Sequence, residues 1–234
     1  VCQVTSSLFK ERPQYFLSFK DASTNFVKIY PIASKADVCS RITKYINWVN
    51  TQFDHKVKSF FTDQGSEYLN EKVSKLLSEK GVELHYTSGY TPASNGVAER
   101  LNLTIMNDVR SMLIDANLPS SFWPEAATYS VMLRNHMWSD RLQSSPAGLL
   151  GIRKLSYAHL HTFGEKVFVK ILPESAKTDA RSHIGVYLGF DDDTFGNSVF
   201  IPSTAGDLRV GTFQKTRHCR FPRSGIMYTA DPSS

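Results

Sequence analysis

The sequence predicts a mixed α/β domain followed by a small all-β module. Three observations support this class: strand-like and helix-like segments alternate over about the first 135 residues, residues 139–158 lack periodicity, and short strand patterns separated by turn residues follow. The length of 234 residues suits one large or two small domains, and 41% of the residues are hydrophobic. This composition excludes a disordered chain, and the absence of an apolar run of about 18 residues excludes a bilayer protein.

The elements of the first part follow from hydrophobic periodicity and turn residues. Residues 14–19 and 25–32 are aromatic and β-branched runs joined by a short polar turn, a pattern typical of two antiparallel strands. Ser34 and Asp37 form a capping-box pattern, and apolar residues then recur at helical spacing over 35–53. The remaining predicted elements are a strand at 56–62, a helix at 68–79, a strand at 82–87, a loop at 88–95, a helix at 96–115 and a helix after 119–121.

The second part is predicted to contain only strands. Strand patterns occupy 163–170, 184–190, 198–202 and 208–221, with turn clusters between them. We therefore predict a first domain at 1–135, the end of a helix and a linker at 136–158, a β-barrel at 159–223 and a tail at 224–234.

Asp63 and Glu99 are the candidate catalytic and metal-binding carboxylates. Asp63 follows an apolar strand at the start of a Gly-containing turn, which is expected at the carboxyl edge of a sheet, where α/β proteins bind ligands. Glu99 is expected on the first turn of a helix behind a flexible loop, with Asn95 as its N-cap. Two carboxylates held in this way suit Mg²⁺. Their spacing alone, however, favours a turn aspartate and a helix-start glutamate.

Local motifs, in contrast, favour a catalytic role for these two carboxylates. The segments TDQGSEY at 62–68 and NGVAER at 95–100 are followed by SFWPEA at 121–126, HTFG at 161–164 and GVYLGF at 185–190, and YTP at 90–92 lies in the loop. Together they resemble, in order and over nearly the whole chain, the integrases of Copia-type (Pseudoviridae) LTR retrotransposons, a branch of the retroviral-type integrases. Gln64 departs from the more common Asn without removing a carboxylate. The resemblance implies an RNase H-like mixed sheet with flanking helices, followed by an SH3-like barrel.

The resemblance implies DNA integration by two-metal phosphodiester chemistry. Water trims a DNA 3′ end and the new 3′ hydroxyl attacks target DNA, with two Mg²⁺ or Mn²⁺ ions held in part by Asp63 and Glu99. It also implies double-stranded DNA (element ends and target) as the partner, a homo-oligomer, no membrane, and a nuclear location with a cytoplasmic virus-like-particle stage.

The resemblance also implies a first metal-binding aspartate, which would lie one residue before Val1. Asp21 follows a strand, but a turn role is the expected one for it. We therefore expect residues 1–234 taken alone to be catalytically incompetent, which leaves open whether this chain is an enzyme. The alternative is a degenerate or domesticated integrase fragment that binds DNA or partners without catalysis. A nuclease of the RNase H type acting on RNA:DNA hybrids fits the loop, the helix and the β module poorly.

Basic residues near the C-terminus are candidate DNA ligands. Residues 209–228 contain five basic and no acidic residues, among them Lys215, Arg217 and Arg220. A strand of this kind can bind phosphates, and it can equally be a charged edge that discourages aggregation. Beside the carboxylates, Arg100 is a candidate phosphate ligand, a partner of Glu99 or a solvent-facing residue, and Asn95 is a candidate DNA contact.

Overall fold

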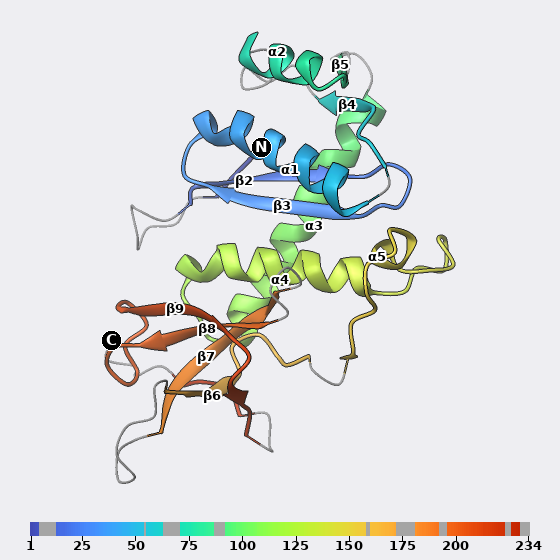
Figure 1. The fold of residues 1–234 in the computed structure, drawn as a ribbon. Coiled ribbons are helices and arrows are strands. Elements are labelled where there is room, and N and C mark those ends of the chain that lie inside the picture. Colours follow the sequence, from blue (N-terminus) through green and yellow to red (C-terminus); the bar gives the residue numbers. More distant parts are fainter. Residues whose placement is uncertain are drawn as a thin grey trace. The chain divides into compact units, whose positions relative to one another are not determined.

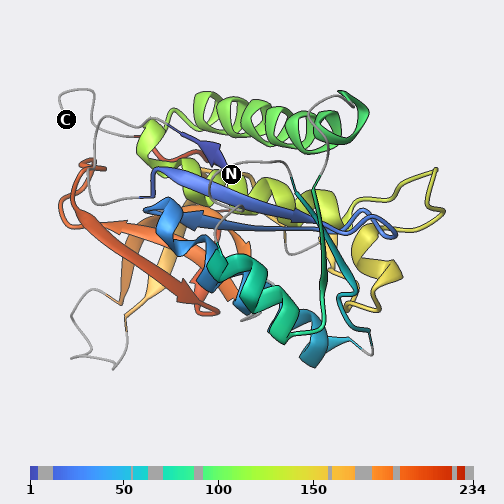
Figure 2. The ribbon, with the colours of Figure 1, turned by 90° about the horizontal axis from the view of Figure 1, so that it is seen from above.

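The computed structural model describes residues 1–4, 13–53, 55–62, 71–86, 92–157, 160–171, 181–191, 196–222 and 226–229, with backbone alone at 92–95. These residues form two compact units, Val1–Thr104 and Ile105–Ser234 (Figure 1). The helix α3 (Pro92–Asp115) is continuous and contributes to both units (Figure 2). Within the described ranges, no helix is both long and apolar enough to cross a bilayer.

The first unit begins with an antiparallel sheet. Its strands β1 (Cys2–Gln3), β2 (Tyr15–Lys20) and β3 (Val27–Ile32) pair in the order β1-β2-β3, which confirms the predicted strand pair. The turn between β2 and β3 is closed by Asp21, whose Oδ2 accepts hydrogen bonds of 2.7 Å from both the backbone N–H and the hydroxyl of Thr24. Asp21 therefore has the turn role that the sequence predicts.

The predicted first helix is confirmed with its capping box. Ser34 and Asp37 cap a short 3-10 turn, η1 (Lys35–Asp37), which continues as α1 (Val38–Gln52). The apolar face of α1 packs on the sheet, because its buried residues belong to the same core cluster as side chains of β2 and β3. The α1 residues in this cluster are Val38, Ile42, Tyr45 and Ile46.

A βαβ segment completes the first unit. The strands β4 (Ser59–Thr62) and β5 (Glu83–Tyr86) are parallel, and α2 (Glu71–Glu79) lies between them in sequence. Val73 and Leu77 of α2 are buried in the core cluster, and the Phe60 ring meets Phe19 edge-on at 5.9 Å. Among the described strands, β4 and β5 form their own pair and do not join β1, which is only two residues long. The mixed α/β class is confirmed.

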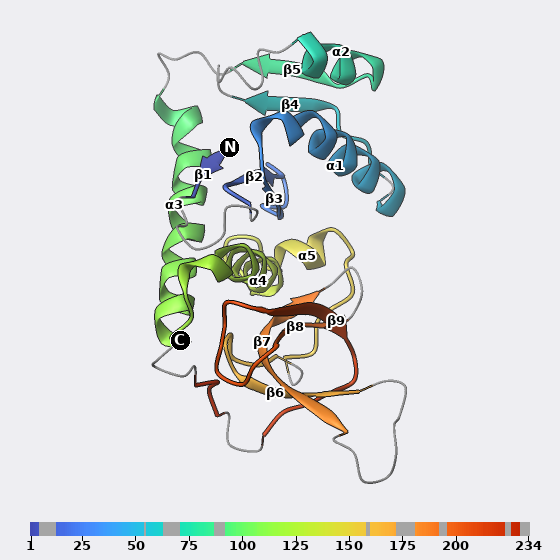
Figure 3. The same cartoon turned by 90° about the vertical axis from the view of Figure 1, so that its left-hand side faces the viewer.

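Helices cover both faces of the β1-β2-β3 sheet. Side chains alternate along a strand, and Leu17 and Phe19 of β2 face the core cluster that contains α1. Ser18 faces the other way, and its hydroxyl donates a 3.0 Å hydrogen bond to Asn102 Oδ1 of α3. The sheet therefore lies between α1 and the N-terminal half of α3 (Figure 3), in the layered arrangement of an RNase H-like core.

The second unit contains two further helices. A 3-10 turn, η2 (Ser120–Phe122), leads into the predicted helix α4 (Trp123–His136), which is buried along most of its length. The stretch 139–158, predicted as an aperiodic linker, contains a short helix, α5 (Pro146–Leu149), in which Ser145 Oγ caps the Gly148 N–H at 3.1 Å. Four residues are too few for a periodicity signal, so this helix could not be read from the sequence pattern.

Five antiparallel strands make up the β module. They are β6 (Lys166–Lys170), β7 (Ser182–Asp191), β8 (Gly196–Pro202), β9 (Gly211–Thr216) and β10 (Cys219–Arg220), in the order β10-β6-β7-β8-β9. The edge strands β9 and β10 are separated in sequence by only Arg217 and His218.

This short connection shows that the sheet is strongly curled. Three peptide steps from Thr216 to Cys219 span at most about 11 Å. The two edges of a flat five-stranded sheet would lie about 19 Å apart. The strands therefore curl toward a barrel (Figure 3), which agrees with the predicted SH3-like module. The predicted strand at 208–221 is wrong in detail, because the chain turns at Arg217 and His218 and changes edges there.

The helix α4 packs against β7 of the barrel. Gly189 has a φ of +120°, and an added Cβ there would lie 2.6 Å from the ring of Tyr129 on α4. The compact second unit thus includes α4, whereas the sequence places this helix at the end of the first domain. The predicted domain boundaries at residues 135, 158 and 223 stay predictions.

Candidate functional site

The strand β4 ends directly before the first candidate carboxylate in sequence. Thr62, the last residue of β4, pairs with Tyr86, the last residue of β5. The carboxyl edge of the strands is the usual ligand-binding edge of an α/β protein. Asp63 is the first residue after β4, and it lies outside the described residues together with the rest of 63–70.

The helix that carries Glu99 begins earlier than predicted. α3 starts at Pro92, so the predicted loop does not extend to residue 95 and Asn95 lies inside the helix instead of capping it. Proline favours this first position, because its fixed φ suits the helix and its missing N–H needs no partner there. The Asn95 side chain is outside the described part, so its contact with DNA stays a prediction.

Glu99 is consequently on the second turn of α3, where its side chain is exposed. The helix dipole acts mainly on the first turn, so it does not account for a carboxylate at this position. Among the described residues no ion pair engages Glu99, and no three His, Cys, Asp or Glu side chains gather as a metal site. A complete set of metal ligands would therefore need residues outside this part, Asp63 among them.

A polar contact that sequence reasoning missed holds the Glu99 turn on the sheet. Asn102 lies one helical turn after Glu99, on the same side of α3, and accepts the hydrogen bond from Ser18 of β2. The available signal was Ser18 itself, a polar residue in the apolar run Tyr15–Phe19. Its partner is 84 residues away in sequence, which local pattern cannot identify.

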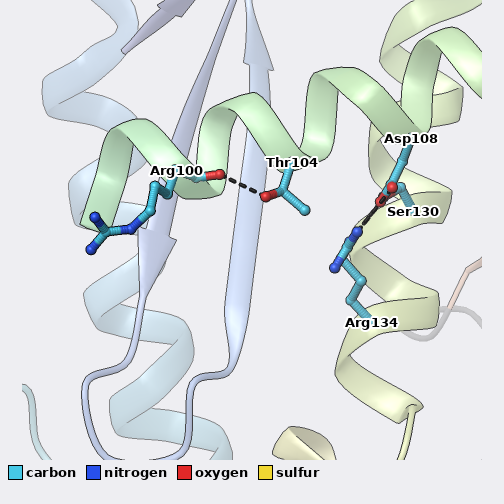
Figure 4. Close-up of polar contacts among 5 residues, drawn as sticks. All are labelled: Arg100, Thr104, Asp108, Ser130 and Arg134. Atoms are coloured by element: carbon cyan, nitrogen blue, oxygen red, sulfur yellow. Dashed lines mark hydrogen bonds and ion pairs between the residues drawn. The ribbon is translucent and has the colours of Figure 1, made fainter. Parts of the chain in front are cut away.

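Arg100 is exposed and folds back along α3. An added Cβ at Gly96 would lie 3.0 Å from Arg100 Nη1, so the absence of a side chain at Gly96 makes room for the guanidinium. Figure 4 shows this side chain directed toward the N-terminal end of α3, with the Arg100 carbonyl accepting a 2.7 Å hydrogen bond from Thr104. The structure records no Arg100–Glu99 ion pair within its described part. A phosphate contact by Arg100 stays a prediction.

The C-terminal half of α3 is bound to α4 by a carboxylate clamp. Asp108 Oδ2 accepts hydrogen bonds from Ser130 Oγ at 2.5 Å and Arg134 Nε at 2.6 Å, and Oδ1 accepts one from Arg134 Nη2 at 2.9 Å (Figure 4). Burial raises the pKa of Asp108, but the hydrogen bonds from Arg134 and Ser130 and the Arg134 charge outweigh burial and lower the pKa below its ordinary value. The clamp therefore carries a stable negative charge at neutral pH.

The three candidate basic residues of the barrel are exposed but lie on two different strands and a turn. Lys215 on β9 forms an ion pair with Asp191, at the end of β7. Arg217 is in the turn after β9, and Arg220 on β10 lies opposite Phe168 of β6. The stretch 209–228 contains no acidic residue, but Asp191 of β7 pairs with Lys215. The role of the three basic residues in DNA binding stays a prediction.

Two of the motifs behave as packing determinants of the second unit. In HTFG, the backbone of Gly164 has a φ of +85° and approaches Ala116 so closely that an added Cβ would overlap its methyl group. The carbonyl of His161 accepts a 2.7 Å hydrogen bond from the Tyr129 hydroxyl. In GVYLGF, Gly189 meets the Tyr129 ring. These glycines are required by close approach and positive φ.

The fold class is that of retroviral integrases. A chain in the cryo-EM structure of the simian T-cell lymphotropic virus intasome in complex with PP2A regulatory subunit B56 gamma matches with a TM-score of 0.50 and 15% sequence identity. The match covers 94% of this chain and 81% of that chain. At this identity the likeness concerns the fold alone.

Relatives found by sequence show which group of integrases this chain is similar to. The Ty1-LR3 and Ty1-NL2 Gag-Pol polyproteins of Saccharomyces cerevisiae are each 31% identical to the chain over 199 residues, or 84% of it. The chain spans about 11% of the length of these relatives. No family model matches it. By sequence and fold together, the chain belongs to the integrases of Copia-type LTR retrotransposons, as its motifs predict.

Proposed function

We propose that this chain is the part of a retrotransposon integrase that trims DNA 3′ ends and joins them to target DNA. The observation that carries the proposal is the exposed position of the motif carboxylate Glu99 on a helix turn that is bonded to the first sheet. Asp63 directly follows the carboxyl end of β4, and the exposed Glu99 lies on a helix bonded to β2 through Asn102 and Ser18. The family resemblance of both motifs supports the same roles.

The donor set fits divalent cations. Carboxylates are the protein ligands that Mg²⁺ prefers beside phosphate oxygens and water, and Glu99 is exposed on a turn fixed by the Asn102 contact. Asp63 and Glu99 would hold Mg²⁺ or Mn²⁺, two ions in the complete family site, together with the first aspartate that the family requires. When bound, such ions stabilise the entering and leaving oxygens of an in-line displacement at phosphorus.

The remaining candidate residues would hold the nucleic acid. Arg100 lies next to Glu99 in sequence and exposes its guanidinium, which suits a phosphate of the DNA being processed. Asn95 precedes it by five residues on the same helix. Lys215, Arg217 and Arg220 would bind phosphates at the edges of the barrel. We further propose that the protein works as a homo-oligomer on paired element ends, in the nucleus, after a cytoplasmic virus-like-particle stage.

The test is a strand-transfer assay with Mg²⁺, a labelled element-end duplex and a target duplex. The assayed protein is residues 1–234 with the aspartate that the family requires placed directly before Val1. Asp63→Asn and Glu99→Gln should each lower the yield of trimmed and joined products by at least about 100-fold, since even outer-shell partners of a metal are worth 10–100-fold. The matched control is Asp115→Asn, which removes an exposed carboxylate at the other end of α3 and should retain activity.

The same assay distinguishes an active integrase from the two alternative functions, a non-catalytic DNA-binding integrase and a nuclease of the RNase H type. Binding of both duplexes without any product, in unmutated protein, would favour an integrase that binds DNA without catalysis. Cleavage of an RNA:DNA hybrid in preference to DNA joining would favour a nuclease of the RNase H type. Full activity of the Glu99→Gln variant would overturn the assignment of this carboxylate.

A further inference from the structure

The strand pair β4-β5 carries an exposed aromatic stack on one of its faces. Phe61 of β4 pairs with His85 of β5, and their rings are nearly parallel, with a centroid distance of 4.8 Å and an interplanar angle of 17°. Phe61 is 68% exposed, and the His85 side chain is 45% exposed. Phenylalanine is among the residues most often buried, so a stacked ring pair open to solvent indicates a surface for a partner.

Strand geometry explains why these rings do not join the core. Side chains alternate along a strand, so Phe61, Glu83 and His85 share one face of the pair. Phe60 and Leu84 share the other face, and they pack against the core cluster that contains α1 and α2. The face with the stacked rings is therefore directed away from the core of the first unit.

A carboxylate lies beside the stacked rings. Glu83 Oε2 is 3.3 Å from His85 Nε2, and the Glu83 side chain is 77% exposed. This contact restrains the His85 ring in the stack. A carboxylate has acceptor sites on two oxygens, so Glu83 can accept a further N–H donor while it contacts His85. We call Phe61, Glu83 and His85 the β4–β5 platform.

The composition of the platform selects a planar base over a phosphate or a protein surface. Stacked aromatic rings present a π face on which any nucleobase can stack. The negative charge of Glu83 disfavours a phosphate at the same place. The apolar surface is one ring pair wide and has the polar residues Ser59 and Glu83 on the same face, whereas protein interfaces use larger apolar patches. Because a base inside a duplex is already paired and stacked, the platform suits an unpaired base.

Glu83 adds a preference among the bases. A carboxylate accepts a hydrogen bond from the N4 amine of cytosine. Thymine carries the carbonyl oxygen O4 at the corresponding position, and a carboxylate repels it. The two bases stack similarly because both are pyrimidines. The platform should therefore prefer cytosine to thymine.

The proposed reaction supplies an unpaired base near this strand pair. Trimming of a DNA 3′ end leaves the 5′ end of the opposite strand without pairing partners. Phe61 precedes the candidate carboxylate Asp63 by two positions in sequence, and β4 ends between them. The overhang and the platform thus belong to the same step of the proposed function.

We infer that the β4–β5 platform binds an unpaired base of the 5′ overhang at a DNA end. The base stacks on the ring pair and donates a hydrogen bond to Glu83, with cytosine preferred to thymine. The inference rests on the proposed function for the origin of the overhang. It goes beyond that function because it assigns recognition of a base, separate from the metal-binding carboxylates and from the phosphate ligands of the barrel.

Equilibrium binding of the full chain, in EDTA so that no chemistry occurs, tests the platform. The probes are labelled duplexes of one sequence that are blunt or carry a short 5′ overhang of cytosine, thymine or abasic nucleotides. Unmutated protein should bind the cytosine overhang about 5- to 140-fold more tightly than the abasic overhang, the range expected for stacking of a base on an aromatic ring. Equal affinity for these two probes would refute the inference.

The abasic probe also separates stacking from phosphate binding. It carries the same phosphates as the cytosine overhang, so the affinity ratio of the two probes reports on the base alone. A phosphate contact to a single strand contributes about 0.7 to the slope of log Kobs against log salt, whereas stacking releases no counterion. The ratio should therefore stay constant as salt is raised. A ratio that falls to one at high salt would refute a stacking platform.

Variants at Phe61 locate the effect. Phe61→Leu removes the ring from an exposed position and should bring the cytosine-to-abasic ratio close to one, with unchanged affinity for the blunt duplex as the check on folding. Phe61→Trp should retain the ratio. The matched control is Trp138→Leu, which removes a ring that is 63% exposed outside β4 and β5 and should also retain the ratio. Equal losses in Phe61→Leu and Trp138→Leu would refute a local platform.

Glu83→Gln tests the preference among bases. An amide both donates and accepts hydrogen bonds, so this variant should bind the cytosine and thymine overhangs about equally. It should still prefer both to the abasic overhang, because the ring pair is intact. Unchanged discrimination between cytosine and thymine would refute the role of Glu83.

Failure of the inference and failure of the proposed function are distinguishable. Strand transfer that depends on Glu99, in a protein without any base preference, refutes only the platform. A base preference that Phe61→Leu abolishes, in a protein that forms no trimmed or joined product, refutes only the proposed function. Absence of DNA binding by unmutated protein refutes both.

Discussion

Gly189 lies where the barrel strand β7 meets the helix α4, and its replacement by alanine tests how tightly the two are packed. An added Cβ would lie 2.6, 2.7 and 2.9 Å from Tyr129 Cδ2, Cγ and Cβ, well inside van der Waals contact. Tyr129 cannot easily move away, because its hydroxyl is bonded to the His161 carbonyl at 2.7 Å and its side chain is 97% buried. The φ of +120° adds backbone strain for any residue with a Cβ.

The steric overlap with Tyr129 and the backbone strain together set the expected loss of unfolding free energy. Overpacking of a buried site costs about 1–3 kcal/mol, and a non-glycine residue at a sparsely populated positive φ costs about 1–3 kcal/mol. Gly189→Ala should therefore lower the free energy of unfolding by about 2–6 kcal/mol, a large part of the stability of an ordinary domain. The matched control is Gly81→Ala, because Gly81 has a φ of +67° but no atom within 4 Å of an added Cβ. It should lose only about 1–2 kcal/mol.

Urea unfolding followed by tryptophan fluorescence measures both variants. The double variant Gly189→Ala with Tyr129→Ala completes a mutant cycle, in which part of the cost of Gly189→Ala should disappear because the clashing Cγ and Cδ2 atoms are gone. A loss below 1 kcal/mol for Gly189→Ala, or a loss equal to that of Gly81→Ala, would refute the packing of α4 on β7 described above. So would strictly additive effects in the cycle.

Two further predictions concern the charged groups. Because the pKa of Asp108 is lowered in the folded state, its stabilising effect is present above the unfolded-state value of about 3.9 and is lost as the pH falls through the folded-state pKa. The difference in unfolding free energy between unmutated protein and Asp108→Asn should accordingly shrink below about pH 4, and a constant difference from pH 7 to pH 3 would contradict the clamp. In DNA binding, Arg220→Gln should lower the salt slope by about 0.9, whereas Lys215→Gln should lower it less because Asp191 pairs with Lys215. Asp191→Asn should raise affinity, and a loss of affinity in that variant would contradict the competition between Asp191 and phosphate.

Local pattern was sufficient for most elements of the fold. The runs around Tyr15–Lys20 and Val27–Ile32, the capping box at Ser34 and the apolar face of α1 are all short-range features, and each is present where it was predicted. The start of α3 was missed because turn-forming residues at 92–95 also suit the first turn of a helix after a proline. The strand at 208–221 was predicted as one because its break at Arg217 and His218 has no turn signature.

The sequence by itself determined the class of the molecule and the order of its elements, since these depend on periodicity and turn residues. Its resemblance to an integrase family singled out Asp63 and Glu99 as candidate carboxylates. Only the tertiary structure decided which distant residues meet. Ser18 reaches Asn102 across 84 residues and Lys215 meets Asp191 across 24. Lys28 lies over Trp48 because a strand edge and a helix pack together. Such contacts depend on the path of the whole chain, so no local pattern contains them, and they determine which charges are neutralised and which are available to a partner.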